Sequence, residues 1–145
     1  MTLNKKTFQE LTTAELYELL RIRCEVFVVE QNCPYQDLDY DDQAAIHLWL
    51  KDQDRIVALC RVCPAGTHME EVSIGRVITT VRGKGYGKQI MLAGIEAARE
   101  HFGATRIDLE AQEYAKGFYE QVGFKQSSDT FILDGIPHVK MTRMF

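Results

Sequence analysis

The 145-residue sequence has no apolar run close to the roughly 20 residues that a membrane-spanning helix needs. Its N-terminal segment also lacks the apolar core of a secretory signal, so we expect a cytoplasmic protein. Only four cysteines are present, which in that compartment argues against a disulfide framework. The three prolines and ten glycines form no repeat or linker, and the sequence therefore predicts one domain over residues 1–145.

Positive charge is scarcer than negative charge, with 17 lysines and arginines against 21 aspartates and glutamates and a formal net charge of -4. Nucleic-acid binding depends on clustered positive charge, so this balance argues against a nucleic-acid partner. The lack of a long apolar run argues in the same way against a membrane partner. What is present is an ordinary globular composition, with 46% apolar residues that are sufficient for one core.

The predicted elements follow a mixed α/β order. Apolar spacing predicts helices over residues 13–29, 85–102 and 113–122, and Thr12 and Glu15 form a capping box before the first. Strands are predicted at residues 5–10, 46–50, 56–62, 71–81, 107–111, 131–133 and 138–144. The helix at 85–102 and the strands on either side of it make one βαβ unit, which requires parallel strands and a right-handed crossover.

A glycine-rich segment, residues 82–88 with the sequence RGKGYGK, lies between the strand at 71–81 and the helix at 85–102. Closely spaced glycines let backbone N–H groups approach a ligand, and a helix N-terminus favours an anion such as pyrophosphate. A dinucleotide-binding fingerprint would need glycine or alanine where Lys88 stands, and a P-loop would need serine or threonine where Gln89 stands. Neither motif fits, and a glycine-rich turn without a ligand is the alternative.

Two segments resemble the motifs of the GNAT superfamily of N-acetyltransferases. Residues 77–88, VITTVRGKGYGK, resemble motif A, which holds the pyrophosphate of coenzyme A, and residues 115–124, AKGFYEQVGF, resemble motif B. Segments at 29–35 and 135–138 are similar to the ElaA-like branch, so that the resemblance spans nearly the whole chain. It implies a GNAT-type three-layer α/β/α domain with a mixed, twisted sheet of six or seven strands.

The resemblance also implies an enzyme that uses acetyl-CoA as co-substrate, without a metal, and transfers acetyl to a primary amine of a small molecule or peptide. Attack of the amine within a ternary complex is the expected mechanism, and a homodimer is common among relatives. The positions that match the family's cofactor contacts are Gly75, Arg76, Val77, Arg82, Gly83, Lys84, Gly85, Tyr86, Gly87 and Lys88. The alternative is a catalytically silent module that binds acetyl-CoA as a sensor or scaffold.

Tyr119 matches the motif B tyrosine that protonates the leaving thiolate in many relatives, and a phenol suits that proton transfer. A core tyrosine is the alternative. The general base stays open among Glu71, where some relatives carry a glutamate, Glu110 on the following strand, and His47. A solvent-facing Glu71 and a core His47 are the simpler interpretations.

The stretch between Cys24 and Leu50 contains no lysine or arginine but six acidic residues. In the family this region walls the acceptor site, and an acidic wall would concentrate a cationic amine. A solvated acidic loop is the alternative. Glu30, Tyr35 and His138 are the candidate substrate contacts.

Cys60 and Cys63 have the C-x-x-C spacing of some zinc and redox sites. A zinc knuckle needs a turn on which both sulfurs converge, whereas side chains three apart on a strand point to opposite faces. The sequence contains no second pair of this kind, so it predicts no metal site.

Overall fold

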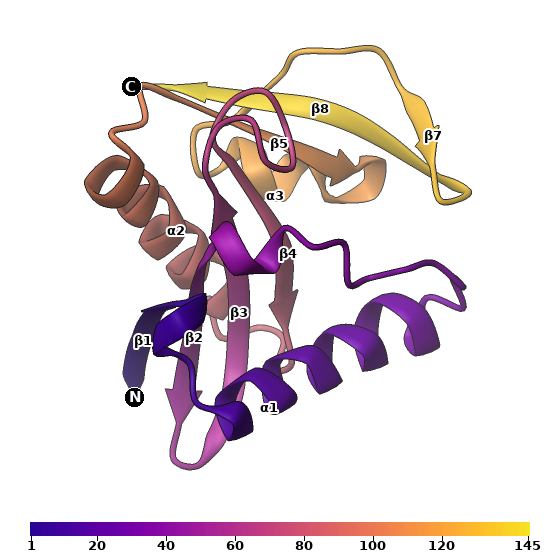
Figure 1. The fold of residues 1–145 in the computed structure, drawn as a ribbon. Helices are drawn as coiled ribbons and strands as arrows, with labels where there is room; N and C mark the ends of the chain where they lie inside the picture. The colour runs from indigo at the N-terminus through magenta and orange to yellow at the C-terminus, as the bar shows by residue number, and fades with distance from the viewer.

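One mixed sheet of eight strands organises the chain in the computed structural model, which describes residues 1–145 (Figure 1). The strands are β1 (Thr2–Thr7), β2 (Ile46–Asp52), β3 (Arg55–Cys63), β4 (Ser73–Thr79), β5 (Arg106–Gln112), β6 (Lys125–Gln126), β7 (Phe131–Leu133) and β8 (Ile136–Met144). Their order is β1-β2-β3-β4-β5-β8-β6, with β7 paired to β8. The α/β class is confirmed, but the expected six or seven strands were too few because the two residues of β6 show no alternation.

The helices are α1 (Thr13–Arg23), α2 (Tyr86–Phe102) and α3 (Lys116–Glu120), with 3-10 turns at Phe8–Glu10, Asp42–Ala44 and Glu113–Ala115 and a π-helical segment at Cys24–Glu30. The predicted helix over 13–29 is confirmed in extent, but its second half is π-helical rather than α-helical. That half contains three valines, whose branched side chains crowd an α-helical backbone. The predicted first strand at 5–10 also ends earlier, at Thr7.

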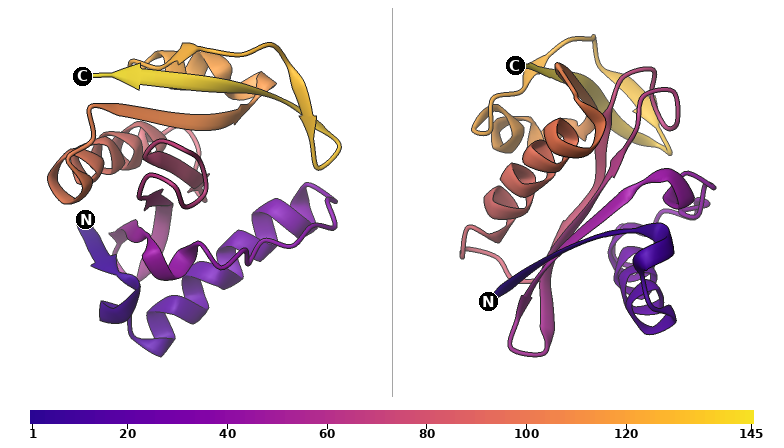
Figure 2. Two further views of the ribbon diagram at one scale, coloured as in Figure 1. Left: turned by 45° about the horizontal axis from the view of Figure 1, so that its top comes forward. Right: turned by 60° about the vertical axis from the view of Figure 1, so that its left-hand side comes forward.

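The two faces of the sheet are covered from opposite sides, as Figure 2 shows for α1 and α2. On one face, the apolar row of α2 that includes Ile90 and Ile95 is buried in the main core. On the other face, Ile22 of α1 packs in a smaller cluster that includes Trp49 of β2. No helix is both long and apolar enough to cross a bilayer, and all four cysteines are free thiols.

The sheet opens between its two central parallel strands. β4 and β5 share only one pair of partners, Ser73 and Asp108, at the start of each strand. Beyond that pair the strands diverge, and Figure 1 shows β5 and β8 lying across the direction of β3 and β4. Backbone groups of β4 that face β5 therefore have no strand partner past Ser73.

Candidate active site

The glycine-rich loop leads into α2 with its backbone exposed. Gly83 and Gly85 have φ angles of 77° and 74°, and an added Cβ would find no atom within 4 Å at either position. The first N–H groups of α2 have no acceptor inside the helix, and the N-cap residue Gly85 supplies no side-chain acceptor. The loop is therefore shaped to present N–H groups to an anion.

The basic side chains of the loop are free to add charge to that site. Arg82, Lys84 and Lys88 are exposed, and none of them forms an ion pair in the chain. Gly87 differs from the other loop glycines because it is buried. A Cβ at Gly87 would meet the Phe118 ring and Thr79 at 3.2 Å, so this glycine permits α2 to pack closely against α3 and β4.

A β-bulge distorts β4 beside the opening of the sheet. Leu59 pairs with Ile78 and Arg61 pairs with Gly75, so β4 uses one residue more than β3 over the same distance. Arg76 lies in this bulge with a φ of 52°, a left-handed conformation that costs free energy in a residue with a side chain. Such strain persists only where surrounding contacts enforce it.

Gly75 and Glu110 stand on either side of the gap, each two residues beyond the last paired position of β4 and β5. An added Cβ on Gly75 would meet nothing within 4 Å, so the face of β4 at this position is open. Leu109 and Ala111 belong to the core under α2, which directs Glu110 to the opposite face of the sheet.

Tyr119 lies on the α2 side of the sheet, in an aromatic cluster. Its ring centroid is 5.0 Å from that of Phe118 and 6.3 Å from that of Phe124, both in edge-on geometry. The hydroxyl forms no hydrogen bond within the chain. Because no side-chain polar atom of the chain is fully buried without a partner, this hydroxyl must reach the surface. Burial of the ring, with Tyr114 and Cys60 nearby, raises the pKa of Tyr119 above its usual range and keeps the phenol protonated.

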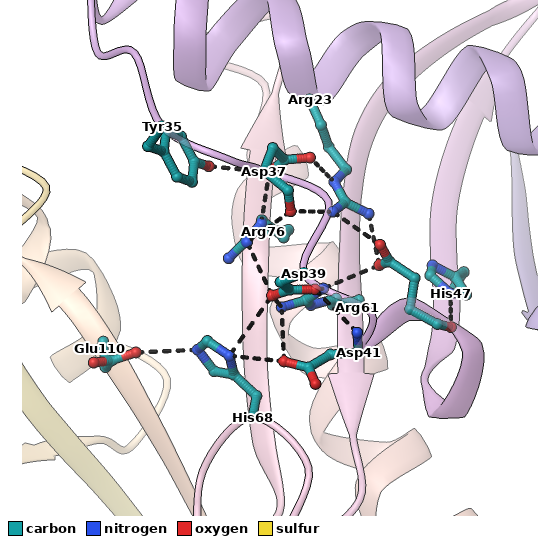
Figure 3. A network of polar contacts seen from close by, with 11 residues as sticks. Arg23, Tyr35, Asp37, Asp39, Asp41, His47, Arg61, His68, Arg76 and Glu110 are labelled. Carbon is teal, nitrogen blue, oxygen red and sulfur yellow. Dashed lines mark hydrogen bonds and ion pairs between the residues drawn. The ribbon is translucent and has the colours of Figure 1, made fainter.

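The acidic stretch is not a solvated loop, because three arginines from outside it pair with its aspartates (Figure 3). Arg23 of α1 lies 2.9 Å from Asp37 and 2.8 Å from Asp42. Arg61 of β3 lies 3.0 Å from Asp42, and its side chain is only 2% exposed.

The same network reaches the bulge of β4. The Arg76 guanidinium lies 2.7 Å from Asp37 and 3.2 Å from Asp39, and it stacks over the Tyr35 ring at 5.8 Å. The Tyr35 hydroxyl donates to Asp37 over 3.0 Å. These contacts hold Arg76 in its left-handed conformation. They also neutralise most of the charge of the acidic stretch within the fold. Both interpretations of that stretch, as an acidic wall for a cationic amine and as a solvated loop, are therefore corrected.

His68 joins this network to the gap, although no sequence pattern singled it out. It lies in the connection between β3 and β4, with Nδ1 3.2 Å from Asp41 Oδ2 and Nε2 3.1 Å from Glu110 Oε1. The hydrogen bond to Glu110 raises the pKa of His68, and the same contact lowers the pKa of Glu110. Asp39, Asp41 and His68 bring polar atoms within 4.8 Å of one another. Asp39 already accepts hydrogen bonds from Arg61 and Arg76, and His68 already pairs with Glu110, so these atoms are not free to bind a cation.

The other candidate bases lie apart from the gap or in the core. Glu71 precedes β4 at its paired end, where Asp108 and, more weakly, Glu71 raise the pKa of Arg106. His47 is 4% exposed, and its Nε2 lies 2.9 Å from the Asp42 carbonyl oxygen. Burial lowers the pKa of His47, as expected for a core histidine.

Of the three candidate substrate residues, two have partners within the fold and one is exposed and unpaired. His138 is 8% exposed, stacks on Phe131 at 6.1 Å, and donates from Nδ1 to the Ile136 carbonyl over 2.7 Å. That bond leaves Nε2 without a partner in the chain. Glu30 is exposed and unpaired at the end of the π-helical segment, whereas Tyr35 is engaged in the arginine network.

The model of the acetyltransferase (GNAT) domain family matches residues 9–145. The chain belongs to the GNAT acetyltransferase family. Protein ElaA of Escherichia coli is 41% identical over 138 residues, covering 92% of this chain and 90% of ElaA. The crystal structure of E. coli ElaA matches with a TM-score of 0.90 at 38% identity, over 98% of each chain. That of an acyl-CoA N-acyltransferase from Pseudomonas aeruginosa matches with a TM-score of 0.90 at 35% identity, over 99% of each chain.

The GNAT assignment and the ElaA-like resemblance are thereby confirmed, and the chain is an acyltransferase whose acyl donor derives from coenzyme A. The residues present fit such a donor. The loop glycines leave room for a diphosphate beside free N–H groups, and the divergence of β4 from β5 past Ser73 leaves backbone groups of β4 unpaired for an extended arm. The individual cofactor contacts stay predictions.

Proposed function

We propose that this chain transfers the acetyl group of acetyl-CoA to a primary amine. The observation that carries the proposal is the gap between β4 and β5, which has the uncapped N-terminus of α2 at one end and Glu110 and Tyr119 on opposite faces of the sheet. A turn that only binds an anion would need neither the gap nor these two side chains.

Donor binding falls to the backbone and to three basic side chains. The amides of residues 83–88 would hold the diphosphate, with Arg82, Lys84 and Lys88 adding positive charge. The unpaired edge of β4 at residues 75–77 would hold the pantetheine arm. Bound there, acetyl-CoA supplies an acetyl thioester, and β4 N–H groups that lack a strand partner would stabilise negative charge on the carbonyl oxygen.

Glu110 is the residue that we assign to the amine. It lies level with the β4 bulge, on the face toward the acidic loop, and its Oε2 has no partner in the chain. During transfer the amine N–H bond breaks and its proton passes to Glu110, directly or through water, while the nitrogen forms the new bond to the acetyl carbon. Glu71 and His47 are less suitable because they lie away from the gap.

Tyr119 is the residue that we assign to the leaving group. When the bond from the acetyl carbon to sulfur breaks, the phenol donates its proton to the thiolate, and solvent then restores the phenol. The phenol of Tyr119 carries this proton at neutral pH, because burial raises its pKa from a value that already lies well above neutral. Because Tyr119 and Glu110 act from opposite faces of the sheet, the amine and the thiol need not compete for one space.

The proposal is tested by thiol release from acetyl-CoA over a panel of primary amines, together with calorimetry of coenzyme A binding. We expect a measurable affinity for coenzyme A and amine-dependent release. Coenzyme A binding with no turnover on any amine would favour the silent binding module instead.

A matched pair of glycine variants locates the donor site. Gly85→Val places a branched side chain at the start of α2, and we expect coenzyme A affinity to fall at least tenfold. Gly103→Val is the control, because Gly103 has a similar left-handed conformation, with φ of 59°, at the far end of the same helix. Both variants will lose stability from backbone strain, so equal losses of affinity would contradict the proposed site.

A further inference from the structure

We propose that His68 is a positioning residue for acyl transfer, which fixes the Glu110 carboxylate at the gap and keeps it ionised when the amine arrives. This inference rests on the proposed function, in which Glu110 meets the amine. It concerns a residue in the connection between β3 and β4, a segment that otherwise contributes nothing to the site.

His68 lies between two carboxylates that come from different parts of the chain (Figure 3). Its Nδ1 is 3.2 Å from Asp41 Oδ2 in the acidic loop, and its Nε2 is 3.1 Å from Glu110 Oε1 on β5. The ring therefore bridges the gap on the side where we expect the amine. A surface histidine with no role would not need both ring nitrogens engaged.

The protonation state of His68 follows from these partners. Ionised carboxylates only accept hydrogen bonds, so a ring that satisfies both must donate from both nitrogens, as an imidazolium. Asp39, 3.9 Å from Nδ1, favours the same charge, while Arg61 on β3 opposes it. The hydrogen bond to Glu110 and that to Asp41 together raise the pKa of His68 despite its partial burial.

The effect on Glu110 is reciprocal. The bond from His68 is the largest influence that lowers the pKa of Glu110, and His138 on β8 and Arg76 on β4 add to it. Oε1 is held by the imidazolium, so the carboxylate cannot rotate freely, and Oε2 is left for an incoming N–H group. His68 thereby sets both the orientation and the charge of the group that receives the amine.

The test is the pH dependence of kcat/KM for His68→Gln. Glutamine keeps a polar side chain but carries no charge, so Glu110 will be protonated at a higher pH than in the wild type. We expect about a tenfold fall in kcat/KM on the acid side of the profile and a much smaller fall on the alkaline side. A merely structural role would lower kcat/KM equally at every pH, and that result would overturn the proposal. His101→Gln, at an exposed histidine near the end of α2, is the matched control.

A second readout needs no activity. Carbon-detected NMR of the glutamate carboxyl groups follows the titration of Glu110 in the wild type and in His68→Gln, and we expect its midpoint to rise in the variant. An unchanged midpoint would overturn the inference, even in an active enzyme. If the wild type acetylates no amine but the midpoint still rises, then the proposed function fails while the coupling between His68 and Glu110 stands.

Discussion

The buried ion network beneath the acidic loop gives a sharp prediction for stability. Asp42 accepts hydrogen bonds from Arg23 at 2.8 and 3.2 Å and from Arg61 at 3.0 Å. The Arg23 and Arg61 side chains are 2% exposed and that of Asp42 is 8% exposed. Asp42→Asn removes one negative charge but keeps the shape of the side chain, so that two buried guanidinium groups lose a shared counter-ion.

The expected loss follows from that burial. Removing one partner of a buried ion pair destabilises a protein by about 3–5 kcal/mol, and we expect about 3 kcal/mol because Asp37 and Asp39 still neutralise part of the charge. The entropy of unfolding of a chain this long is about 0.3 kcal/mol per kelvin at the midpoint. The variant should therefore melt about 10 °C below the wild type.

The assay is thermal unfolding followed by circular dichroism across a range of pH. Although burial alone would raise the pKa of Asp42, its hydrogen bonds with Arg23 and the charges of Arg23 and Arg61 lower it. The stabilisation is therefore fully present above the pKa of an unfolded aspartate, about 3.9, and is lost as the pH falls through the lower pKa of the folded state. The gap in melting temperature between wild type and variant should be constant near neutral pH and shrink below about pH 4.

The control is Glu100→Gln, which breaks a surface ion pair with Lys5. The N–O distance in that pair is 3.1 Å, similar to the distances in the buried network. The Glu100 side chain is 52% exposed, so the melting temperature should barely change. If Asp42→Asn melts within 2 °C of the wild type, then the buried ion network beneath the acidic loop does not stabilise the fold by the amount expected.

Three further predictions follow from single contacts. Tyr119→Phe should lower kcat about 100-fold with no change in coenzyme A affinity, measured by thiol release and calorimetry, and an unchanged kcat would remove this tyrosine from the mechanism. Gly87→Ala should lower the melting temperature, because its Cβ would lie 3.2 Å from the Phe118 ring. Gly117→Ala is the control and should not lower it, because a Cβ there would have no atom within 4 Å. Equal melting temperatures for the two variants would contradict this packing. Burial lowers the pKa of His47, so the stability of the fold falls as the pH drops below about 6.5, the pKa of an unfolded histidine. The melting temperature of His47→Gln should therefore depend less on pH in this range. An identical pH dependence would show that His47 is not buried as a neutral ring.

The parts of the fold that the sequence predicted are those with a strong local signal. The βαβ unit around residues 82–88 was found because glycines, a strand pattern and a helical pattern meet at one point of the chain. The capping box of Thr12 and Glu15 is confirmed, with hydrogen bonds of 2.8 and 3.1 Å, because it too depends on adjacent residues. The GNAT resemblance then extended these local signals to the full domain.

The parts that were missed depend on partners far apart in the sequence. Nothing near the acidic stretch indicates that Arg23 and Arg61 turn inward to neutralise it, since each lies among apolar residues of another element. His68 stands in an irregular connection, without a motif or a period to mark it, and only the folded chain brings it beside Glu110. The choice among candidate bases depended on the same long-range geometry, which is why the sequence left it open.

The most direct test of the account is a crystal structure with bound coenzyme A. We expect the diphosphate to lie on the amides of residues 83–88 and the pantetheine arm to enter between β4 and β5, with its sulfur near Tyr119. Density for coenzyme A at another face of the sheet, with the gap between β4 and β5 filled by side chains, would contradict the assignment.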